Sequence, residues 1–395
     1  MSAFTASRTS GWLSAADCSI DDFAAVVEQQ TQLSHYPHAD AVERKVLIYG
    51  EKLHEAIGTP RGRTAVQTEL IRALTEGPGI VVFKQAFGDL SVVDRVSEAF
   101  LAQIAAEKAA GLAGGDHFAK PGANDRVWGA LDKLALHDPG VFAEYYANDI
   151  IALISEAWLG PNYQVTSQVN VVNPGGHAQT AHRDYHLGFM NAMAAARFPA
   201  QVHRLSPALT LQGAVAHCDM PVETGPTLYL PYSHQYEPGY LAFHLPAFTE
   251  YFAQNYTQLP LEKGDAAFFN PALFHGAGTN VSTTVRRMAN LLQVSSPFGR
   301  AMETVDRVAM CRSLFPVLLE KKASDASDSY LNNVIAASAE GYAFPTNLDR
   351  DQPIDGIAPQ TQADLLRQAV AEEWTPAAFE SALDAQVART HPHHG

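Results

Sequence analysis

Along the first third of the chain, hydrophobic positions recur at the spacing of helices. Ser19 is followed three residues later by Asp22, the spacing of a capping box, and apolar residues then continue at helical intervals to Val27. We therefore predict a helix that begins after Ser19, and further helices over residues 41–57 and 64–74.

A strand followed by a helix is predicted next. The run from Gly79 to Phe83 is short, rich in β-branched residues and begins with glycine, which is typical of a strand. Ser91 and Asp94 then repeat the capping-box spacing ahead of apolar residues that recur through Ile104. The pattern indicates a strand that leads into a helix.

From about Tyr163 the pattern changes to short β-type runs separated by Pro, Gly and Asn turns. These runs cover residues 164–172, 209–218, 227–230, 265–269 and 290–294. Such spacing is typical of an antiparallel sandwich or barrel. Beyond Pro297, helical patterns return over residues 302–319 and 362–374.

Composition and charge narrow the classes of function. The 395 residues are 47% hydrophobic and 17% charged, which is ample apolar content for a large core. Lys and Arg number 27 against 42 Asp and Glu, so the net charge is -15. Because this charge repels phosphate backbones and anionic membranes, we expect neither a nucleic-acid nor a membrane partner.

The cysteines and the hydropathy indicate a compartment. Cys18, Cys218 and Cys311 are odd in number and far apart, which fits neither a disulfide framework nor a paired Cys-x-x-Cys zinc site. The N-terminal residues 1–18 lack an apolar signal region, and no apolar run reaches the roughly 20 residues of a membrane span. We therefore expect a cytoplasmic protein in a reducing environment.

The clearest chemical signal is the segment from Gln179 to Asp184. It contains an H-x-D pair, His182 and Asp184, whose side chains alternate onto the same face of an extended strand. His275, well downstream, offers a third ligand. Two histidines and one carboxylate on one face make the facial triad of non-haem Fe(II) oxygenases, which leaves iron positions open for a co-substrate and oxygen.

An arginine that could bind a co-substrate follows the third ligand along the chain. Arg286 stands eleven positions after His275 and is followed by Arg287. A guanidinium carried by a strand there can pair in bidentate fashion with the distal carboxylate of 2-oxoglutarate.

Four blocks of the sequence together resemble the phytanoyl-CoA dioxygenase-like family of Fe(II)/2-oxoglutarate-dependent oxygenases. They are Gln179-x-x-His182-x-Asp184, the strand and turn from Glu223 to His234, the pair Gly264-Asp265, and His275-Gly276 through Arg286. The resemblance covers roughly residues 77–300. The chain departs from the family at Tyr232, where a turn glycine is usual.

The resemblance implies an α+β fold with a mainly β core, a double-stranded β-helix of the jelly-roll or cupin-like type with flanking N- and C-terminal helices. It implies an N-terminal helical extension over 1–76, the oxygenase domain over 77–300 and a C-terminal helical extension over 301–395.

The resemblance also implies roles for individual residues. His182, Asp184 and His275 are the expected iron ligands, and Arg286, favoured over Arg287 by register, is the expected partner of the 2-oxoglutarate C5 carboxylate. Expected to bind the co-substrate beside them are Thr227, Asn170 and Gln179.

The implied cofactors are Fe(II), 2-oxoglutarate as co-substrate, and O2. The implied reaction is hydroxylation of a C–H bond in a small organic metabolite, with release of succinate and CO2. Related halogenases carry a small residue at the place of Asp184, so that chloride can bind iron, and the carboxylate here favours hydroxylation, with desaturation or epimerisation as further outcomes. The substrate itself and the oligomeric state stay open.

Other interpretations remain. His217 and Asp219 form a second H-x-D pair, for which a buried or rim histidine and an Asp-led turn are the preferred account. The apolar stretch 187–198 is either a lid over the substrate or plain core packing. The same triad with Zn(II) or Mn(II) would suit a cupin-like hydrolase or isomerase, and a non-catalytic binding protein could keep the fold alone.

Overall fold

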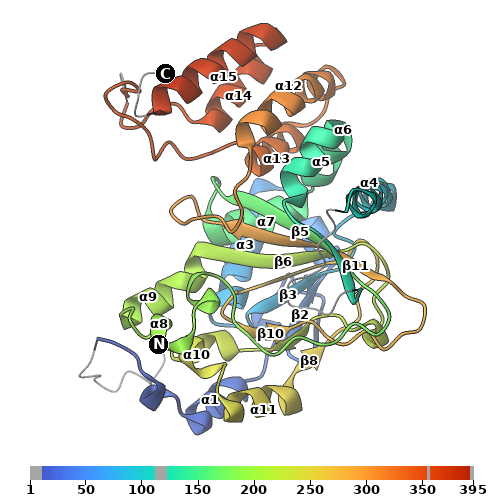
Figure 1. Cartoon of the computed structure of the whole chain (residues 1–395), viewed down its shortest axis with the longest axis vertical. Coiled ribbons are helices and arrows are strands. Elements are labelled where there is room, and N and C mark those ends of the chain that lie inside the picture. Colours follow the sequence, from blue (N-terminus) through green and yellow to red (C-terminus); the bar gives the residue numbers. More distant parts are fainter. Residues whose placement is uncertain (1–10, 112–121, 354–355, 392–395) are drawn as a thin grey trace. The chain divides into compact units, whose positions relative to one another are not determined.

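The computed structural model describes residues 11–111, 122–353 and 356–391 (Figure 1). The chain divides into two compact units, each assembled from segments that are far apart in the sequence. The first unit consists of Met1–Ala86, Gly115–Asp125 and Asn170–Ala289, and the second of Phe87–Gly114, Arg126–Val169 and Asn290–Gly395. The three-part division expected from the sequence, with boundaries after residues 76 and 300, stays a prediction.

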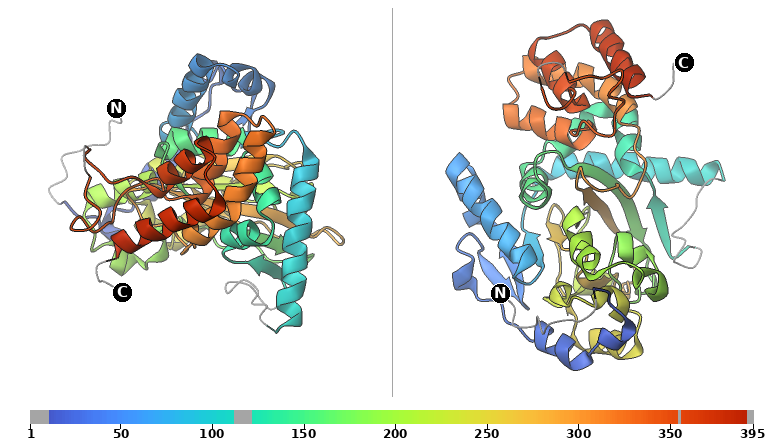
Figure 2. Two further views of the ribbon diagram at one scale, coloured as in Figure 1. Left: turned by 90° about the horizontal axis from the view of Figure 1, so that it is seen from above. Right: turned by 90° about the vertical axis from the view of Figure 1, so that its left-hand side faces the viewer.

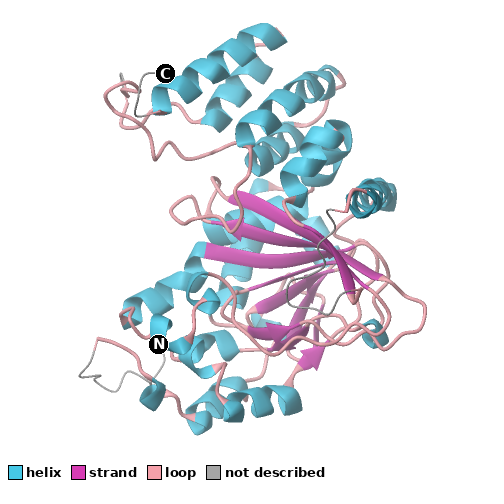
Figure 3. Cartoon of the chain, in the orientation of Figure 1, coloured by secondary structure: helices cyan, strands magenta, loops and turns pink. Residues whose placement is uncertain are grey.

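The strands of the described residues form a large and a small sheet, drawn in magenta in Figure 3. The eight-stranded sheet has the order β1-β2-β3-β9-β6-β11-β5-β4, and the three-stranded sheet has the order β10-β7-β8. Their bounds are β1 (Ala41–Glu43), β2 (Val46–Tyr49), β3 (Ile80–Phe83), β4 (Asn124–Val127), β5 (Gln164–Val172), β6 (Thr210–Ala216), β7 (Leu228–Leu230), β8 (Thr257–Gln258), β9 (Ala266–Phe269), β10 (Phe274–Gly276) and β11 (Arg287–Ser295). Two sheets of this kind with flanking helices confirm the predicted α+β fold with a jelly-roll core.

An apolar cluster in the first unit joins residues of both sheets. The large sheet contributes Ile48, Val82 and Phe269, and the small sheet contributes Tyr229. The rings of Tyr229 and Phe269 meet edge to face, with centroids 5.1 Å apart. All four residues of β3 are buried, which explains why the sequence there is a continuous apolar run rather than an alternating one.

The helix predicted over residues 41–57 is wrong in its first half. Residues 41–49 form β1 and β2, and only Glu51–Ile57 is helical, as α2. Strand β2 pairs in parallel with β3 and all four of its residues are buried. A short apolar run buried on both faces has no period of two, so hydrophobicity alone does not separate it from a helix.

Side-chain caps set the starts of the other early helices. Ser19 accepts a hydrogen bond from the Asp22 backbone at the start of α1 (Ile20–Val27), as predicted. Thr59 caps α3 (Pro60–Thr75) in the same way. The cap of α4 (Leu90–Ala109) is Asp89 and not Ser91, so this helix begins two residues before the predicted one. The further helices of the first unit are α8 (Ala192–Ala195), α9 (Ala200–Leu205), α10 (Gly239–Ala242) and α11 (Pro246–Asn255).

Helices dominate the second unit (Figure 2). Besides α4 they are α5 (Ala130–His137), α6 (Pro139–Tyr146), α7 (Asp149–Leu159), α12 (Arg307–Ala323), α13 (Asp328–Ser338), α14 (Gln362–Ala371) and α15 (Pro376–Thr390). Helix α12 packs against α5, α6, α13, α14 and α15, and its Phe315 stacks on Phe379 of α15 with centroids 4.3 Å apart. None of the helices described is both long and apolar enough for a membrane crossing.

The pair Gly264-Asp265 has a structural role in the first unit. Asp265 is 1% exposed, and its carboxylate lies 2.5 Å from the Lys84 ammonium. It also accepts hydrogen bonds from the backbone nitrogens of Gln85 and Glu262, at 2.9 and 2.8 Å. This carboxylate therefore ties the end of β3 to the turn that precedes β9.

We predict that Asp265→Asn lowers the free energy of unfolding by about 2 kcal/mol or more, because it removes the charge from a buried, multiply bonded group. Chemical denaturation measures this effect. Glu262→Gln is the matched control, since Glu262 lies 3.3 Å from the same Lys84 but is 72% exposed. Its expected cost is less than about 1 kcal/mol, and equal costs for the two variants would contradict this account.

Candidate metal centre

His182, Asp184 and His275 come together in the first unit. Their ligand atoms all lie within 4.8 Å of one another. Nε2 of His182 is 3.6 Å from one Asp184 carboxylate oxygen, and Nε2 of His275 is 3.3 Å from the other. Among the residues that the structure describes, no other three His, Cys, Asp or Glu side chains bring their ligand atoms this close together.

A two-residue bridge of backbone hydrogen bonds brings the histidines together. His182 donates its N–H to the His275 carbonyl at 2.9 Å, and His275 donates to the His182 carbonyl at 3.1 Å. His275 lies in β10, so the His182 segment adds to the small sheet as a further antiparallel neighbour. Asp184 is fixed two residues on, where its N–H donates to the Pro271 carbonyl at 3.0 Å.

Both imidazoles are oriented by backbone carbonyls. Nδ1 of His182 lies 2.8 Å from the Thr180 carbonyl, and Nδ1 of His275 lies 2.8 Å from the Leu273 carbonyl. A carbonyl only accepts, so each Nδ1 carries the hydrogen and each Nε2 presents a lone pair. Nε2 of His275 is buried and makes no hydrogen bond. An oriented, unpartnered nitrogen of this kind is what a metal ion requires.

The charges at the cluster suit a divalent cation. Burial alone would raise the pKa of Asp184, but its contacts with His275, His182 and Gln212 outweigh burial and hold that pKa well below its usual range. Burial, reinforced by the nearby His275, lowers the pKa of His182. The carboxylate is therefore ionised and the His182 imidazole neutral at physiological pH, the forms that bind metal.

Gln212 on β6 is a residue of this cluster that the sequence did not reveal. Its side-chain Nε2 donates to Asp184 at 2.6 Å and holds that carboxylate in place. The other end of the amide, Oε1, is buried and has no hydrogen-bond partner. Gln212 lies in an ordinary β-type run of the sequence. The feature that could have identified it is its polar side chain on a strand whose cross-strand neighbours on β9, Phe269 and Ala267, are apolar.

Arg183, between the two ligands of the H-x-D pair, anchors the segment from the opposite side. It is 2% exposed, and its guanidinium donates to the carbonyls of Ser233 and Tyr236 at 2.6 and 2.9 Å. The same group lies over the ring of Tyr240, 5.0 Å from the centroid. A Cβ on Gly239 would lie 1.9 Å from this guanidinium, so only glycine leaves room for it.

The backbone turns sharply after Asp184. Tyr185 and His186 both have positive φ, at 63° and 47°, which is unfavourable for residues other than glycine. In the following stretch Leu187 is 2% exposed, whereas Phe189 is 60% and Met193 is 81% exposed. The stretch 187–198 thus combines core packing with exposed apolar side chains. Neither a lid over the substrate nor plain core packing describes all of it.

The two neighbouring arginines lie in different environments. Arg286 is half exposed and pairs with Asp125 at 3.0 Å and with the Asn173 side chain at 3.1 Å. Arg287 is 6% exposed, and its Nη1 is buried without a hydrogen-bond partner. Burial lowers the pKa of Arg287 to about 10, so the guanidinium stays charged at neutral pH.

Arg287 faces the side of the small sheet that carries His275. Tyr229, which lies near enough to Arg287 to influence its pKa, is the cross-strand neighbour of His275. Directly opposite residues on antiparallel strands project from the same face. Phe269 contacts both, with centroids 5.1 Å from Tyr229 and 4.7 Å from His275. The alternation of side chains along β11 therefore turns Arg287, and not Arg286, toward this interior.

The remaining predicted contacts fall in three different environments. Thr227 hydrogen-bonds the Tyr229 hydroxyl and so lies near Arg287. Asn170 on β5 accepts a hydrogen bond from Asn124 at 3.3 Å. Gln179 is exposed and accepts from the backbone of Ala277 at 3.1 Å.

The second H-x-D pair and the turn before His234 have structural roles. Asp219 accepts a hydrogen bond from the Lys263 backbone at 3.0 Å, as in the preferred Asp-led turn. Ser233 donates to the Leu230 carbonyl and accepts from the Phe274 backbone, at 2.6 and 2.8 Å. Tyr232 has φ 72°, so a tyrosine adopts the conformation in which the family usually has glycine.

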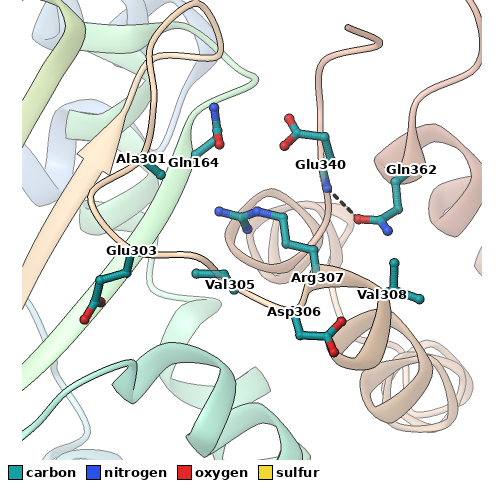
Figure 4. A pocket seen from close by; sticks show the side chains of 9 residues that line it. All are labelled: Gln164, Ala301, Glu303, Val305, Asp306, Arg307, Val308, Glu340 and Gln362. Carbon is teal, nitrogen blue, oxygen red and sulfur yellow. Dashed lines mark hydrogen bonds between the residues drawn. The ribbon is translucent and has the colours of Figure 1, made fainter. Parts of the chain in front are cut away.

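A separate cavity of about 340 Å³ lies in the second unit (Figure 4). Its polar lining includes Gln164, Arg307, Glu340 and Gln362. Arg307 donates to the carbonyls of Val165 and Ala337, at 3.0 and 3.4 Å. The guanidinium thus connects β5 to the end of α13. The residues that line this cavity include no histidine, so they do not form a second set of ligands like the triad.

Two histidines and one carboxylate that converge in a jelly-roll core are the ligand set of mononuclear non-haem metal enzymes. The sequence model of the phytanoyl-CoA dioxygenase family (PhyH) matches residues 75–288, more than half of the chain, and the chain belongs to this family. It is an enzyme of the Fe(II)- and 2-oxoglutarate-dependent type, and its cofactors are Fe(II) and 2-oxoglutarate. No curated protein sequence matches the chain.

Several solved structures are similar over part of the chain. The 2-oxoglutarate-dependent epimerase SnoN from nogalamycin biosynthesis is 20% identical with a TM-score of 0.38, over 59% of this chain and 84% of its own. The carbocyclase SnoK of the same biosynthesis is 19% identical with a TM-score of 0.42, over 60% and 86%. AviO1 from Streptomyces viridochromogenes Tue57 is 16% identical with a TM-score of 0.41, over 60% and 97%.

We predict that Gln212→Leu weakens metal binding by about tenfold or more, because Asp184 loses the donor that orients it. Anaerobic titration with Fe(II) measures this affinity. Unchanged affinity in Gln212→Leu, with the fold intact by circular dichroism, would show that Gln212 does not position the ligand.

Proposed function

We propose that this chain is an Fe(II)- and 2-oxoglutarate-dependent hydroxylase of a small organic metabolite, with His182, Asp184 and His275 as the metal ligands. The observation that carries the proposal is the pair of imidazoles whose Nδ1 atoms are bound to carbonyls, while both Nε2 atoms face one ionised carboxylate. Fe(II) held by these ligands would supply the oxidation of a C–H bond by O2, with 2-oxoglutarate as co-substrate: one oxygen atom of O2 would enter the product as hydroxyl and the other would enter succinate, with release of CO2. A cytoplasmic location stays a prediction.

Each side chain of the cluster has a distinct task in this reaction. The two imidazoles bind the metal as neutral ligands, and Asp184 contributes the negative charge. Because Asp184 occupies the third protein position, no place is kept there for a halide, which supports hydroxylation over halogenation. Gln212 orients the carboxylate, and its unpartnered Oε1 is an acceptor for a donor group on a bound molecule.

We propose Arg287, in place of Arg286, as the partner of the distal carboxylate of 2-oxoglutarate. A buried cation without a partner is unfavourable, and a bound carboxylate would supply both the charge and the acceptors that Nη1 lacks. Arg286 already has a carboxylate partner in Asp125. Tyr229 lies near Arg287, and Thr227 bonds the Tyr229 hydroxyl, so both extend the polar environment of such a carboxylate.

The same guanidinium argues against a cupin-like hydrolase or isomerase with Zn(II) or Mn(II). Lewis-acid chemistry at the metal has no need of a buried cation near His275. An anionic co-substrate does need one, and Arg287 supports this class of reaction.

We predict that Arg287→Ala raises the dissociation constant of 2-oxoglutarate by about tenfold to a hundredfold, because a charge-assisted bidentate pair is lost. Arg286→Ala, the neighbouring residue and matched control, should leave the constant within about twofold. Anaerobic calorimetry of the Fe(II)-loaded proteins measures both values. The opposite ranking would assign the carboxylate to Arg286.

We predict that the Fe(II)-loaded protein converts 2-oxoglutarate to succinate only in the presence of oxygen, and that His275→Ala abolishes this conversion. Quantification of succinate by mass spectrometry, with and without oxygen, is the measurement. A screen of small metabolites for those that accelerate succinate release then identifies the substrate, and a mass gain of one oxygen atom in the product would support hydroxylation. Succinate formed equally without oxygen would contradict the proposal.

A further inference from the structure

A cavity of about 750 Å³ in the first unit lies on the opposite face of the small sheet from the triad. Leu228 on β7 lines it, whereas the next residue, Tyr229, projects toward His275. In the same way Ala181 lines it, whereas His182 projects to the metal cluster. Successive side chains of an extended strand point to opposite faces, so this cavity is separate from the metal site.

One wall of the cavity is a face of helix α11. Thr249, Phe252 and Ala253 line it at the spacing of successive helical turns, and Tyr256, the residue after the helix, continues the lining. Val222, at the start of a short 3-10 helix, and Val281 also line the cavity. Val222, Tyr256 and Val281 are 43%, 42% and 68% exposed, which leaves apolar side chains in contact with solvent at this place.

Four polar side chains of the lining are hydrogen-bonded to the protein itself. Gln258 donates to the Pro226 carbonyl at 2.7 Å, and Thr249 donates to the Pro246 carbonyl at 2.9 Å. Thr279 accepts from the Ala178 backbone at 2.9 Å, and Gln179 accepts from Ala277 at 3.1 Å. What these side chains leave for a ligand is mainly apolar surface, the usual lining of a small-molecule site.

The charge of the cavity lining limits which ligands can bind. Glu223 is the one carboxylate among the described residues that line the cavity, and no Lys, Arg or His is among them. An anionic ligand would meet repulsion from Glu223 with no cation in the lining to offset it. A neutral or cationic ligand would meet none.

We propose that this cavity is a second small-molecule site, separate from the metal centre, that takes an apolar ligand without negative charge. A ligand there contacts Thr180 and Ala181, the two residues before His182, and the Thr180 carbonyl is the acceptor that orients the His182 imidazole. The site is thus placed against the segment that carries the first metal ligand. Its occupant is an apolar neutral or cationic molecule rather than an acyl phosphate or carboxylate.

Two fluorescent probes that differ by a single sulfonate test the proposal. The neutral N-phenyl-1-naphthylamine should bind the full-length protein, and its 8-sulfonate analogue should bind about tenfold more weakly or not at all. Saturating Mn(II) with 2-oxoglutarate should not displace the neutral probe. Equal binding of the two probes, or displacement by the co-substrate, would overturn the proposal.

Matched variants on α11 locate the probe. Ala253→Trp fills the cavity and should weaken binding of the neutral probe by about tenfold or more, while Gln254→Trp, the adjacent residue outside the lining, should leave it within about twofold. Val281→Glu, at a position that is 68% exposed and tolerant of change, should likewise weaken binding of the neutral probe. Glu223→Gln should improve binding of the sulfonate alone. Equal affinities in Ala253→Trp, Val281→Glu and Gln254→Trp would place the probe elsewhere and refute the site.

Discussion

The antiparallel bridge between His182 and His275 is the constraint on which the candidate metal centre depends. Two backbone hydrogen bonds fix the distance between residues that are far apart in the sequence. Each imidazole is then oriented by the carbonyl of the residue two positions before it in the chain, Thr180 or Leu273. Because both the positions and the tautomers come from the backbone, the cluster is organised before a metal binds.

The surroundings of the bridge carry unfavourable features that are held by specific contacts. Tyr185 and His186 adopt positive φ directly after Asp184, and Arg183 is a fully buried cation that only a glycine at position 239 accommodates. Strain and buried charge of this kind persist where neighbouring contacts over-determine the local conformation. Here the hydrogen bonds of Arg183 to Ser233 and Tyr236 hold the segment against the turn that begins with Tyr232.

Much of the fold and the triad could be predicted from the sequence, because motifs and turns are local signals. The H-x-D spacing places His182 and Asp184 on one face, and the jelly-roll class follows from short runs between turns. Register and long-range partners are not local. Residues 46–49 form a strand that pairs with β3, and residues 41–43 pair in turn with residues 46–49. Asp89, and not Ser91, caps α4. Arg286 is bound to Asp125, whereas its neighbour Arg287 is buried with an unpartnered Nη1.

The central claim is that His182, Asp184 and His275 hold iron to which 2-oxoglutarate binds directly. Anaerobic titration of the apo-protein with Fe(II) and 2-oxoglutarate tests it, because the weak visible charge-transfer band arises only when the co-substrate chelates the metal. We expect this band in the wild type and its absence in His182→Ala. A wild-type protein that binds Fe(II) but shows no band on addition of 2-oxoglutarate would contradict the account.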